Sequence, residues 1–168
     1  MLLNPELFSI TQSKEMGMWP PSDLTIDPMY PYIKRFPNNV SFLDVGIMKG
    51  ENIFRLFEKD EKSKIESIYA VKNTEEFDDL IDKNLKDYYG RIAFTTPQEP
   101  VDIVSINSKT DLDKTLDLYY GCVKKGGIFC GNNHNETSVK ESLSRFRRKN
   151  RIGTPISVAL DTWFWFVR

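Results

Sequence analysis

The sequence predicts one α/β domain in which a mostly parallel sheet of about seven strands lies between two layers of helices. Three observations predict this architecture. Apolar, strand-like runs alternate with helical stripes from residue 40 to residue 150, the first run ends in a glycine bend, and the last two runs follow each other almost directly. Alternating strands and helices build a parallel sheet that is covered on both faces. Two strands with so short a connection form an antiparallel pair, so the expected fold is a Rossmann-like three-layer sandwich with that pair at its C-terminal edge.

The expected elements follow from the spacing of apolar residues. The strands cover residues 40–46, 65–71, 91–96, 101–106, 128–131, 156–160 and 162–167. Apolar residues three or four positions apart predict a helix after the first, second, fourth and fifth of these strands. The four helical stripes run over residues 53–57, 77–88, 112–123 and 139–146.

Signals at the helix ends support these positions. Asn73 followed by Glu76 resembles a capping pair for the second helix. Thr110 is expected to cap the third helix. Gly126 and Gly127 are expected to end that helix, because glycine readily adopts the left-handed conformation found there.

The first 38 residues differ from the rest of the chain. Residues 18–37 hold five prolines, which exclude long helices and central strands. We expect an ordered lead-in segment that packs over the core of residues 40–168, with a short helix near residues 29–35. A length of 168 residues suits one domain, so both parts belong to a single unit.

Composition limits the classes of function. With 40% hydrophobic and 28% charged residues, the chain has the composition of a globular domain. A net charge of −1 argues against a nucleic-acid partner, and no apolar run approaches the roughly 20 residues of a membrane helix. The start carries no signal-peptide pattern, and Cys122 and Cys130 are expected to be buried thiols, so we expect a cytoplasmic protein. The aromatic lead-in can pack on its own domain or on a second copy, which leaves a homo-oligomer open.

The glycine bend after the first strand is the principal candidate for a binding site. It reads Asp44-Val-Gly46-Ile-Met-Lys49-Gly50-Glu51. Glycines let a backbone approach a ligand closely, and in parallel sheets ligands bind outside the carboxyl ends of the strands.

A wider pattern surrounds this bend. The segments FLDVGIMKGEN, DIVSIN and VKKGGIFCGNNH, in this order, resemble the class I S-adenosylmethionine-dependent methyltransferases, and most closely the macrocin and rhamnosyl O-methyltransferase-like group. The resemblance covers roughly residues 40–168. It implies an O-methyltransferase that transfers a methyl group from S-adenosylmethionine to a hydroxyl of a sugar, glycan or other small molecule. It also implies that Asp44, Gly46 and Gly50 line the pocket for the methionine part of the cofactor.

The sequence departs from that family at three places. Lys72 ends the second strand, where the family has an acidic residue for the ribose hydroxyls, and an ammonium group has no acceptor. Asn107, Asn132 and Asn133 stand where the metal-dependent members carry acids, so we predict no tightly bound metal. Only six residues, TTPQEP, join the third strand to the fourth, which is too short for the helix that lies beside the adenine in the family.

These departures keep other functions open. Lys49 and Lys72 can attract anions, which favours a nucleotide-sugar and hence a glycosyltransferase, or a binding protein without catalysis on the same fold. Both lysines can instead simply extend into solvent.

Two residues, His134 and Asn107, are predicted to activate the acceptor. His134, the only histidine, has an ordinary pKa suited to a general base, with Asp44 or Asn107 expected to orient its ring. Trp163 and Trp165 are expected in the core, although one of them can form a wall for a stacked sugar. The predicted cofactor-binding residues are Asp44, Gly46, Lys49, Gly50, Lys72, Asn132 and Asn133, and the predicted catalytic residues are His134 and Asn107.

Overall fold

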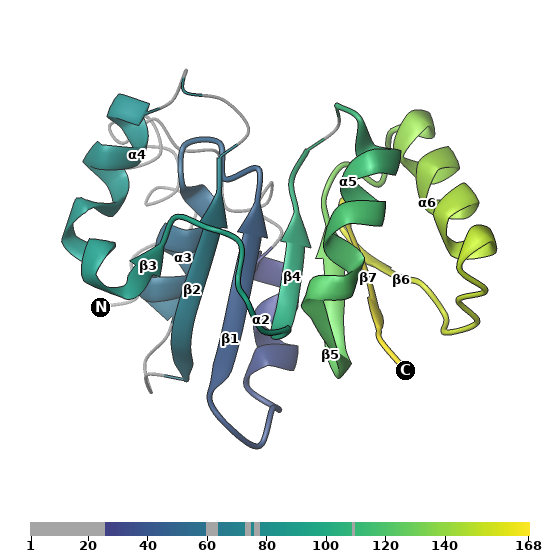
Figure 1. Ribbon diagram of the computed structural model, residues 1–168, viewed down its shortest axis with the longest axis horizontal. Coiled ribbons are helices and arrows are strands. Elements are labelled where there is room, and N and C mark those ends of the chain that lie inside the picture. The colour runs from purple at the N-terminus through teal and green to yellow at the C-terminus, as the bar shows by residue number, and fades with distance from the viewer. Residues whose placement is uncertain (1–25, 60–63, 73–74, 76–77, 109) are drawn as a thin grey trace.

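The computed structural model describes residues 26–59, 64–72, 75, 78–108 and 110–168, and within them it contains one sheet in the order β3-β2-β1-β4-β5-β7-β6 (Figure 1). Its strands are β1 (Val40–Val45), β2 (Ile65–Val71), β3 (Ile92–Ala93), β4 (Val101–Ile106), β5 (Val123–Gly131), β6 (Ser157–Ala159) and β7 (Thr162–Phe166). Strands β1 to β5 pair in parallel, while β7 is antiparallel to both β5 and β6. The predicted seven-stranded, mostly parallel sheet with an antiparallel C-terminal pair is therefore confirmed.

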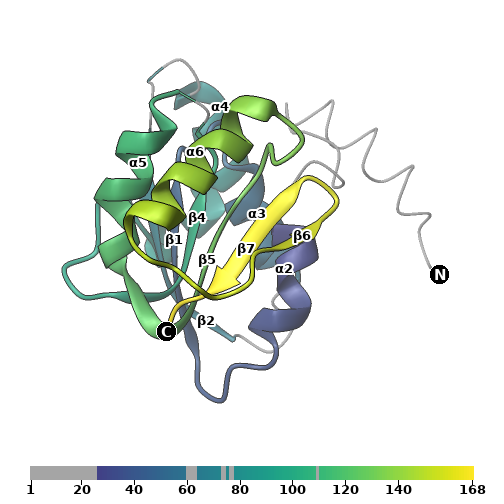
Figure 2. The same ribbon diagram turned by 90° about the vertical axis from the view of Figure 1, so that its right-hand side faces the viewer.

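Helices cover both faces of this sheet (Figures 1 and 2). The helices are α2 (Ile26–Ile33), α3 (Glu51–Lys59), α4 (Asp78–Leu85), α5 (Leu112–Tyr119) and α6 (Thr137–Lys149), with short 3-10 helices η2 (Lys86–Arg91) and η3 (Tyr120–Cys122). Helices α2, α3 and α4 pack on one face, and α5 and α6 on the other. Helix α2, in the described part of the lead-in segment, packs its buried Met29 and Ile33 into the core. None of the described helices has the length and apolarity that crossing a membrane requires.

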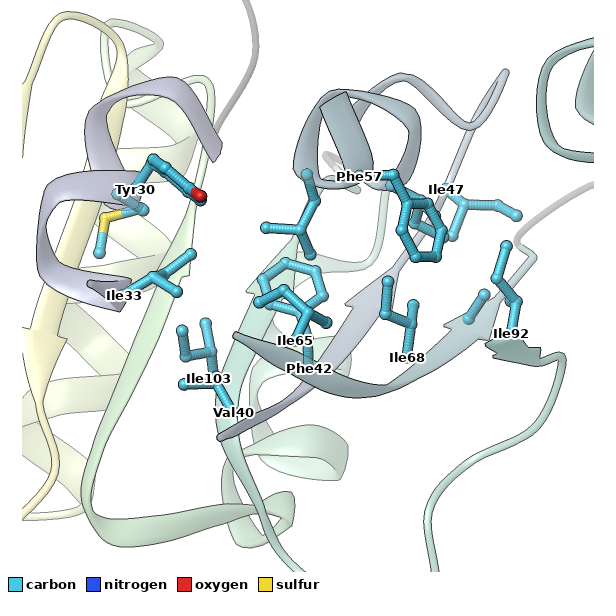
Figure 3. Packing of buried hydrophobic residues seen from close by; sticks show 14 of the residues in the cluster. Tyr30, Ile33, Val40, Phe42, Ile47, Phe57, Ile65, Ile68, Ile92 and Ile103 are labelled. Atoms are coloured by element: carbon cyan, nitrogen blue, oxygen red, sulfur yellow. The ribbon is translucent and has the colours of Figure 1, made fainter. Parts of the chain in front are cut away.

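Side-chain alternation along the strands divides the core into two clusters. Phe42 and Ile68 point to the α3 face, where they meet Phe57 (Figure 3). Leu43, the next residue along β1, points to the α5 and α6 face, where Trp165 is also buried. Because successive residues of a strand face opposite sides, Asp44 lies on the α3 face with Phe42.

The glycines expected to end a helix lie inside a strand instead. Helix α5 ends at Tyr119, and β5 already begins at Val123, so Gly126 and Gly127 are strand residues. A Cβ atom on Gly127 would lie 2.5 Å from the carbonyl oxygen of Asp102 on β4. The glycine pair therefore serves close strand packing at an irregular register, and the prediction that it terminates a helix is wrong.

Two further expectations change in detail, at the start of α5 and in β3. Asp111 rather than Thr110 precedes α5, with a φ of +51° and no side-chain cap. Asp tolerates this left-handed backbone better than a β-branched threonine does, which explains the shift. Strand β3 has two residues instead of six, and no helix separates it from β4. Asn73 and Glu76 lie outside the described residues.

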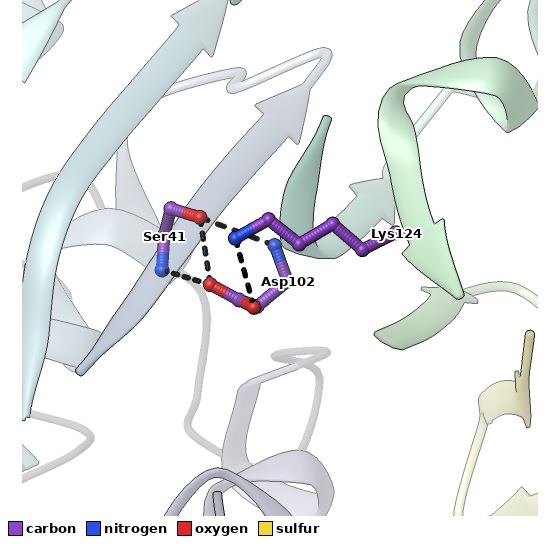
Figure 4. Close-up of polar contacts among 3 residues, drawn as sticks. All are labelled: Ser41, Asp102 and Lys124. Carbon is purple, nitrogen blue, oxygen red and sulfur yellow. Dashed lines mark hydrogen bonds and ion pairs between the residues drawn. The ribbon is translucent and has the colours of Figure 1, made fainter. Parts of the chain in front are cut away.

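A compact polar cluster closes the amino-terminal edge of the sheet (Figure 4). Asp102 Oδ2 accepts hydrogen bonds from the backbone nitrogen of Ser41 at 2.8 Å and from its Oγ at 2.7 Å, and Asp102 Oδ1 lies 3.2 Å from Lys124 Nζ. Burial alone would raise the pKa of Asp102, but the bonds from Ser41 and Lys124 outweigh it and hold that pKa below its usual value. Each carboxylate oxygen of Asp102 thus has a partner.

Candidate functional site

The topology places the candidate site above the carboxyl ends of β1 and β4. The chain extends the sheet outward from β1 through β2 and β3, and in the opposite direction from β4 through β5. Adjacent strands whose connections run in opposite directions form a topological switch point, where ligands bind in folds of this kind. The loops after β1, β2, β4 and β5 all lie along this edge.

Backbone hydrogen bonds hold these loops next to one another. Gly46 N donates to Val71 O at 2.8 Å, and Asn107 N donates to Val45 O at 2.9 Å. Strands in a sheet lie roughly 4.8 Å apart, so Lys72 after β2 and Asn132 after β5 are separated by about 14 Å at their backbones. A ligand that touched both ends would have to be extended.

The loop after β1 adopts left-handed backbone conformations, which glycine allows at two of its positions. The φ angles of Gly46, Met48 and Gly50 are +78°, +49° and +85°, all in the left-handed region. A Cβ atom at Gly50 would lie 2.7 Å from Cδ1 of Leu85 on α4. Gly50 thus lets α4 pack directly against the loop, and Gly46 lets the chain turn away from the strand.

A buried carboxylate lies beneath this loop. Asp44 is completely buried, and its Oδ1 accepts a hydrogen bond from Asn107 Nδ2. Its Oδ2 receives no hydrogen bond from any residue that the structure describes. The pKa of Asp44 is raised to about 7, mainly by burial and in part by the charge of Glu51, against the opposing hydrogen bond from Asn107.

Two more acceptor oxygens near the loop lack donors. Glu51, 3% exposed, accepts a bond from Lys49 N at its Oε2, and Asn84 Nδ2 donates to Lys49 O. Within the described part of the chain, neither Glu51 Oε1 nor Asn84 Oδ1 has a hydrogen-bond partner. Burial raises the pKa of Glu51 as well. Buried polar atoms are normally bonded, so three unsatisfied acceptors around one loop need an explanation.

Asn107 holds this buried network together. Its Oδ1 accepts from Asn52 Nδ2 at 2.9 Å, while its Nδ2 donates to Asp44. Asp44 and Asn107, the residues expected to orient the ring of His134, thus bond each other. Asn107 is buried as well, which favours a role in positioning Asp44 over contact with an acceptor.

Lys72 lies at the end of β2 in an ion pair. Its Nζ is 2.8 Å from Asp78 Oδ1 and 5.6 Å from the centre of the Phe94 ring. Phe94, just after β3, is 42% exposed and meets Tyr89 edge to face at 5.4 Å. This part of the edge therefore combines a carboxylate and an exposed aromatic ring beside Lys72.

The loop after β5 carries the asparagines and the histidine. Trp163 Nε1 donates to Asn132 O at 3.1 Å, and Asn133 adopts a φ of +61°, which asparagine tolerates well. His134 N donates to Asp161 O at 3.0 Å. Burial and the charge of Lys140 lower the pKa of His134 against the opposing charge of Asp161, so its imidazole is neutral and able to accept a proton at neutral pH.

Trp163 and Trp165 lie in the core, as expected. Each is 1% exposed, so the alternative that one of them stacks on a sugar is wrong. Across the described ranges, no three histidine, cysteine, aspartate or glutamate side chains are grouped as metal ligands would be.

Sequence reasoning missed several residues of this edge: Glu51, Asn52, Asp78, Asn84 and Phe94. At the start of a helix Glu51 looks like an ordinary charge that complements the helix dipole. The one available signal was that Glu51 and Asn52 directly follow the glycine bend and precede the buried stripe of α3.

The sheet order and the reversed β7 define a Rossmann-like α/β fold, and the loop after β1 lies at its switch point. The chain is similar to an O-methyltransferase of tomaymycin synthesis from Streptomyces achromogenes, solved with S-adenosylmethionine, at a TM-score of 0.62 and 10% identity over 100% of this chain and 92% of that one. It is similar to a precorrin-6y C5,15-methyltransferase from Geobacter metallireducens, at 0.60 and 16% over 80% and 73% of the two chains.

A third similar structure has nearly the same length as this chain. It is a putative S-adenosylmethionine-dependent methyltransferase from Methanococcus maripaludis, with a TM-score of 0.56 and 17% identity over 99% of this chain and 96% of that one. No family model and no curated protein sequence matches the chain. At these identities the similarity establishes the fold, and the function has to be argued from the site.

Proposed function

We propose that this protein is an S-adenosylmethionine-dependent O-methyltransferase that acts on a hydroxyl of a sugar, glycan or other small molecule. The observation that carries the proposal is the buried carboxylate of Asp44, with an unpartnered oxygen, beneath a glycine loop at the switch point. A buried acidic group without a donor favours a positively charged ligand. S-adenosylmethionine supplies a methyl group on a positively charged sulfur.

The residues of the β1 loop fit the methionine end of that cofactor. Asp44 and Glu51 offer buried acceptors, and the left-handed backbone at Gly46 leaves no side chain between the loop and a ligand. In this proposal Asp44, Gly46, Lys49 and Gly50 line the methionine pocket. Lys49 acts through its backbone, which orients two neighbouring side chains: its N–H donates to Glu51, and its C=O accepts a bond from Asn84.

The nucleoside end fits in a different way from the one that the resemblance implies. Lys72 cannot accept a bond from a ribose hydroxyl, but Asp78, paired with it at 2.8 Å, can. Phe94 offers an exposed ring for a base at the place where a helix is lacking. Asp78 and Phe94 would therefore hold the ribose and the base.

Acceptor activation falls to the loop after β5. A neutral His134 can take the proton from the acceptor hydroxyl, and Asn132 and Asn133 can bind neighbouring hydroxyls of a sugar. Most of the rate would come from holding the two reactants in line.

The free thiols Cys122 and Cys130 accord with a cytoplasmic location.

The alternative, a nucleotide-sugar-dependent transferase, has less support at this edge. This alternative requires the positive charges of Lys49 and Lys72 to attract the anionic diphosphate. The charge of Lys72 is balanced by Asp78, and two buried carboxyl groups lie beside the loop at which a diphosphate would bind. The negative charges of these carboxyl groups and of a diphosphate would repel each other.

Calorimetric titration of the purified protein with S-adenosylhomocysteine, UDP and GDP tests the proposal. We expect micromolar binding of S-adenosylhomocysteine alone, and at least a tenfold loss for Asp44→Ala. Asp102→Ala, at the opposite edge, is the matched control and should bind normally. Binding of a nucleoside diphosphate alone would support the glycosyltransferase, and silence with all three ligands would support a protein without this cofactor.

A further inference from the structure

The loop that carries His134 is bound to the turn between β6 and β7. These two strands and the turn of residues 160–161 form a C-terminal hairpin at one edge of the sheet (Figure 2). His134 N donates to Asp161 O at 3.0 Å, and Asn135 N donates to Asp161 Oδ1 at 2.7 Å. Asp161 thus accepts two consecutive N–H groups of the loop, one through its carbonyl and one through its carboxylate.

The C-terminal hairpin also holds the start of the same loop. Trp163 Nε1 donates to Asn132 O at 3.1 Å. A Cβ atom on Gly131 would lie 2.3 Å from Cζ2 of Trp163, so the glycine lets the indole lie across the end of β5. Because Trp163 is 1% exposed, this contact is fixed by the core.

The backbone of the turn is strained, which accords with a fixed direction. Leu160 adopts a φ of +55°, a left-handed conformation that glycine or asparagine normally supplies in two-residue turns. Its side chain is 69% exposed, whereas the next residue, Asp161, is half-buried against the loop. Strained residues persist where the surrounding contacts determine their conformation.

We propose that Asp161 is a positioning residue for His134, whose loop it holds against the C-terminal hairpin. This inference rests on the proposed function, because the general base is His134. The carboxylate of Asp161 has two roles in it. Its bond to Asn135 N fixes the loop, and its negative charge stabilises the imidazolium that forms when His134 takes the proton of the acceptor hydroxyl.

Two charged groups face the imidazole from the elements around it. Lys140 lies on α6 and Asp161 on the turn. Burial and Lys140 lower the pKa of His134, and Asp161 raises it. Loss of the charge of Asp161 therefore lowers the pKa of His134 further, because only the effects that favour the neutral ring remain.

Two substitutions separate the bond from the charge. Asp161→Asn keeps an oxygen acceptor for Asn135 N and removes the charge, while Asp161→Ala removes both. Asp117→Asn is the matched control, because Asp117 pairs with Lys149 at the far end of α6.

NMR on the full-length protein measures both effects without an acceptor substrate. His134 is the only histidine, so its imidazole signal is unambiguous. We expect its pKa to be lower in both Asp161 variants than in the wild type and in Asp117→Asn. Hydrogen exchange of the Asn135 amide should be at least tenfold faster in Asp161→Ala and within threefold of the wild type in Asp161→Asn.

The outcomes separate this inference from the function beneath it. An unchanged His134 pKa in Asp161→Asn, or unchanged Asn135 exchange in a folded Asp161→Ala, overturns the positioning role and leaves the methyltransferase proposal standing. If Asp161→Ala does not fold, the His134 pKa in Asp161→Asn decides alone. Failure of the wild type to bind S-adenosylhomocysteine in calorimetry overturns both.

Discussion

The two edges of the sheet hold aspartates in opposite environments. At the amino edge, both carboxylate oxygens of Asp102 have partners from Ser41 and Lys124, and the pKa of the group is lowered. At the carboxyl edge, Asp44 has one free oxygen and a pKa raised to about 7. The same residue type thus contributes to folding at one edge and costs stability at the other. Unsatisfied buried acids are tolerated where a ligand completes them, which supports our proposal that the ligand binds at the carboxyl edge.

The largest effect that we expect concerns chemistry at the carboxyl edge. His134→Gln should lower the rate of methyl transfer by about 10²- to 10⁴-fold, because a general base is lost, while the affinity for S-adenosylhomocysteine stays within twofold. Steady-state kinetics and calorimetry measure the two quantities. The wild-type rate should also fall in acid as the imidazole becomes protonated, below pH 6.5 because the pKa is lowered. A variant with normal turnover would remove His134 from the mechanism.

Asp44→Asn tests the cost of the unsatisfied acid. The folded pKa of Asp44, about 7, exceeds the unfolded value of 3.8, so the folded state binds more protons between these values and stability declines as pH rises through that window. Asparagine removes the decline. We expect Asp44→Asn to be more stable than the wild type by roughly 2–4 kcal/mol at pH 8 and by much less near pH 4. Urea denaturation at the two pH values measures this, and a destabilised variant at pH 8 would contradict it.

Asp102→Asn should have the opposite sign. The pKa of Asp102 is lowered on folding, so its contribution is present above the unfolded pKa and disappears as pH falls through the folded pKa. We expect a loss of about 1–2 kcal/mol at pH 7, because a charged acceptor for Ser41 becomes neutral. Ligand affinity should not change. The same urea experiment measures stability, and a stabilised variant would erase the difference between the two edges.

The smallest effect concerns the nucleoside end. Phe94→Ala should weaken S-adenosylhomocysteine binding by about 5- to 10-fold, because stacking of a base on a ring contributes roughly 1 kcal/mol. Phe94→Tyr keeps the ring and should bind normally. Since Phe94 is largely exposed, its removal should shift unfolding little. Unchanged affinity in the alanine variant would place the base elsewhere.

Much of the fold could be predicted from the sequence, because periodicity reports burial directly. The strand runs and the helical stripes are set by apolar spacing, which survives in the folded structure. The prediction for Gly126 and Gly127 is wrong, because a glycine pair after a helical stripe is equally compatible with a helix end and a close strand contact. Only the approach of the Asp102 carbonyl oxygen decides between them.

The candidate site could be predicted only in part. Gly46, Gly50 and Asp44 follow from the strand-to-helix bend, whose place in the fold is local. Glu51 and Asn84 could not be predicted, because their burial depends on the packing of α4 against the loop. The ion pair between Lys72 and Asp78 could not be predicted either, because it depends on where the start of α4 lies relative to the end of β2.

The most direct test of the central claim is the titration of the Asp44 side-chain carboxyl carbon by NMR, in the free protein and in the protein saturated with S-adenosylhomocysteine. We expect a pKa of about 7 in the free protein and a markedly lower one in the complex, since a bound cation stabilises the carboxylate. An ordinary pKa near 3.8 in the free protein, or the same raised value with and without ligand, would contradict the account.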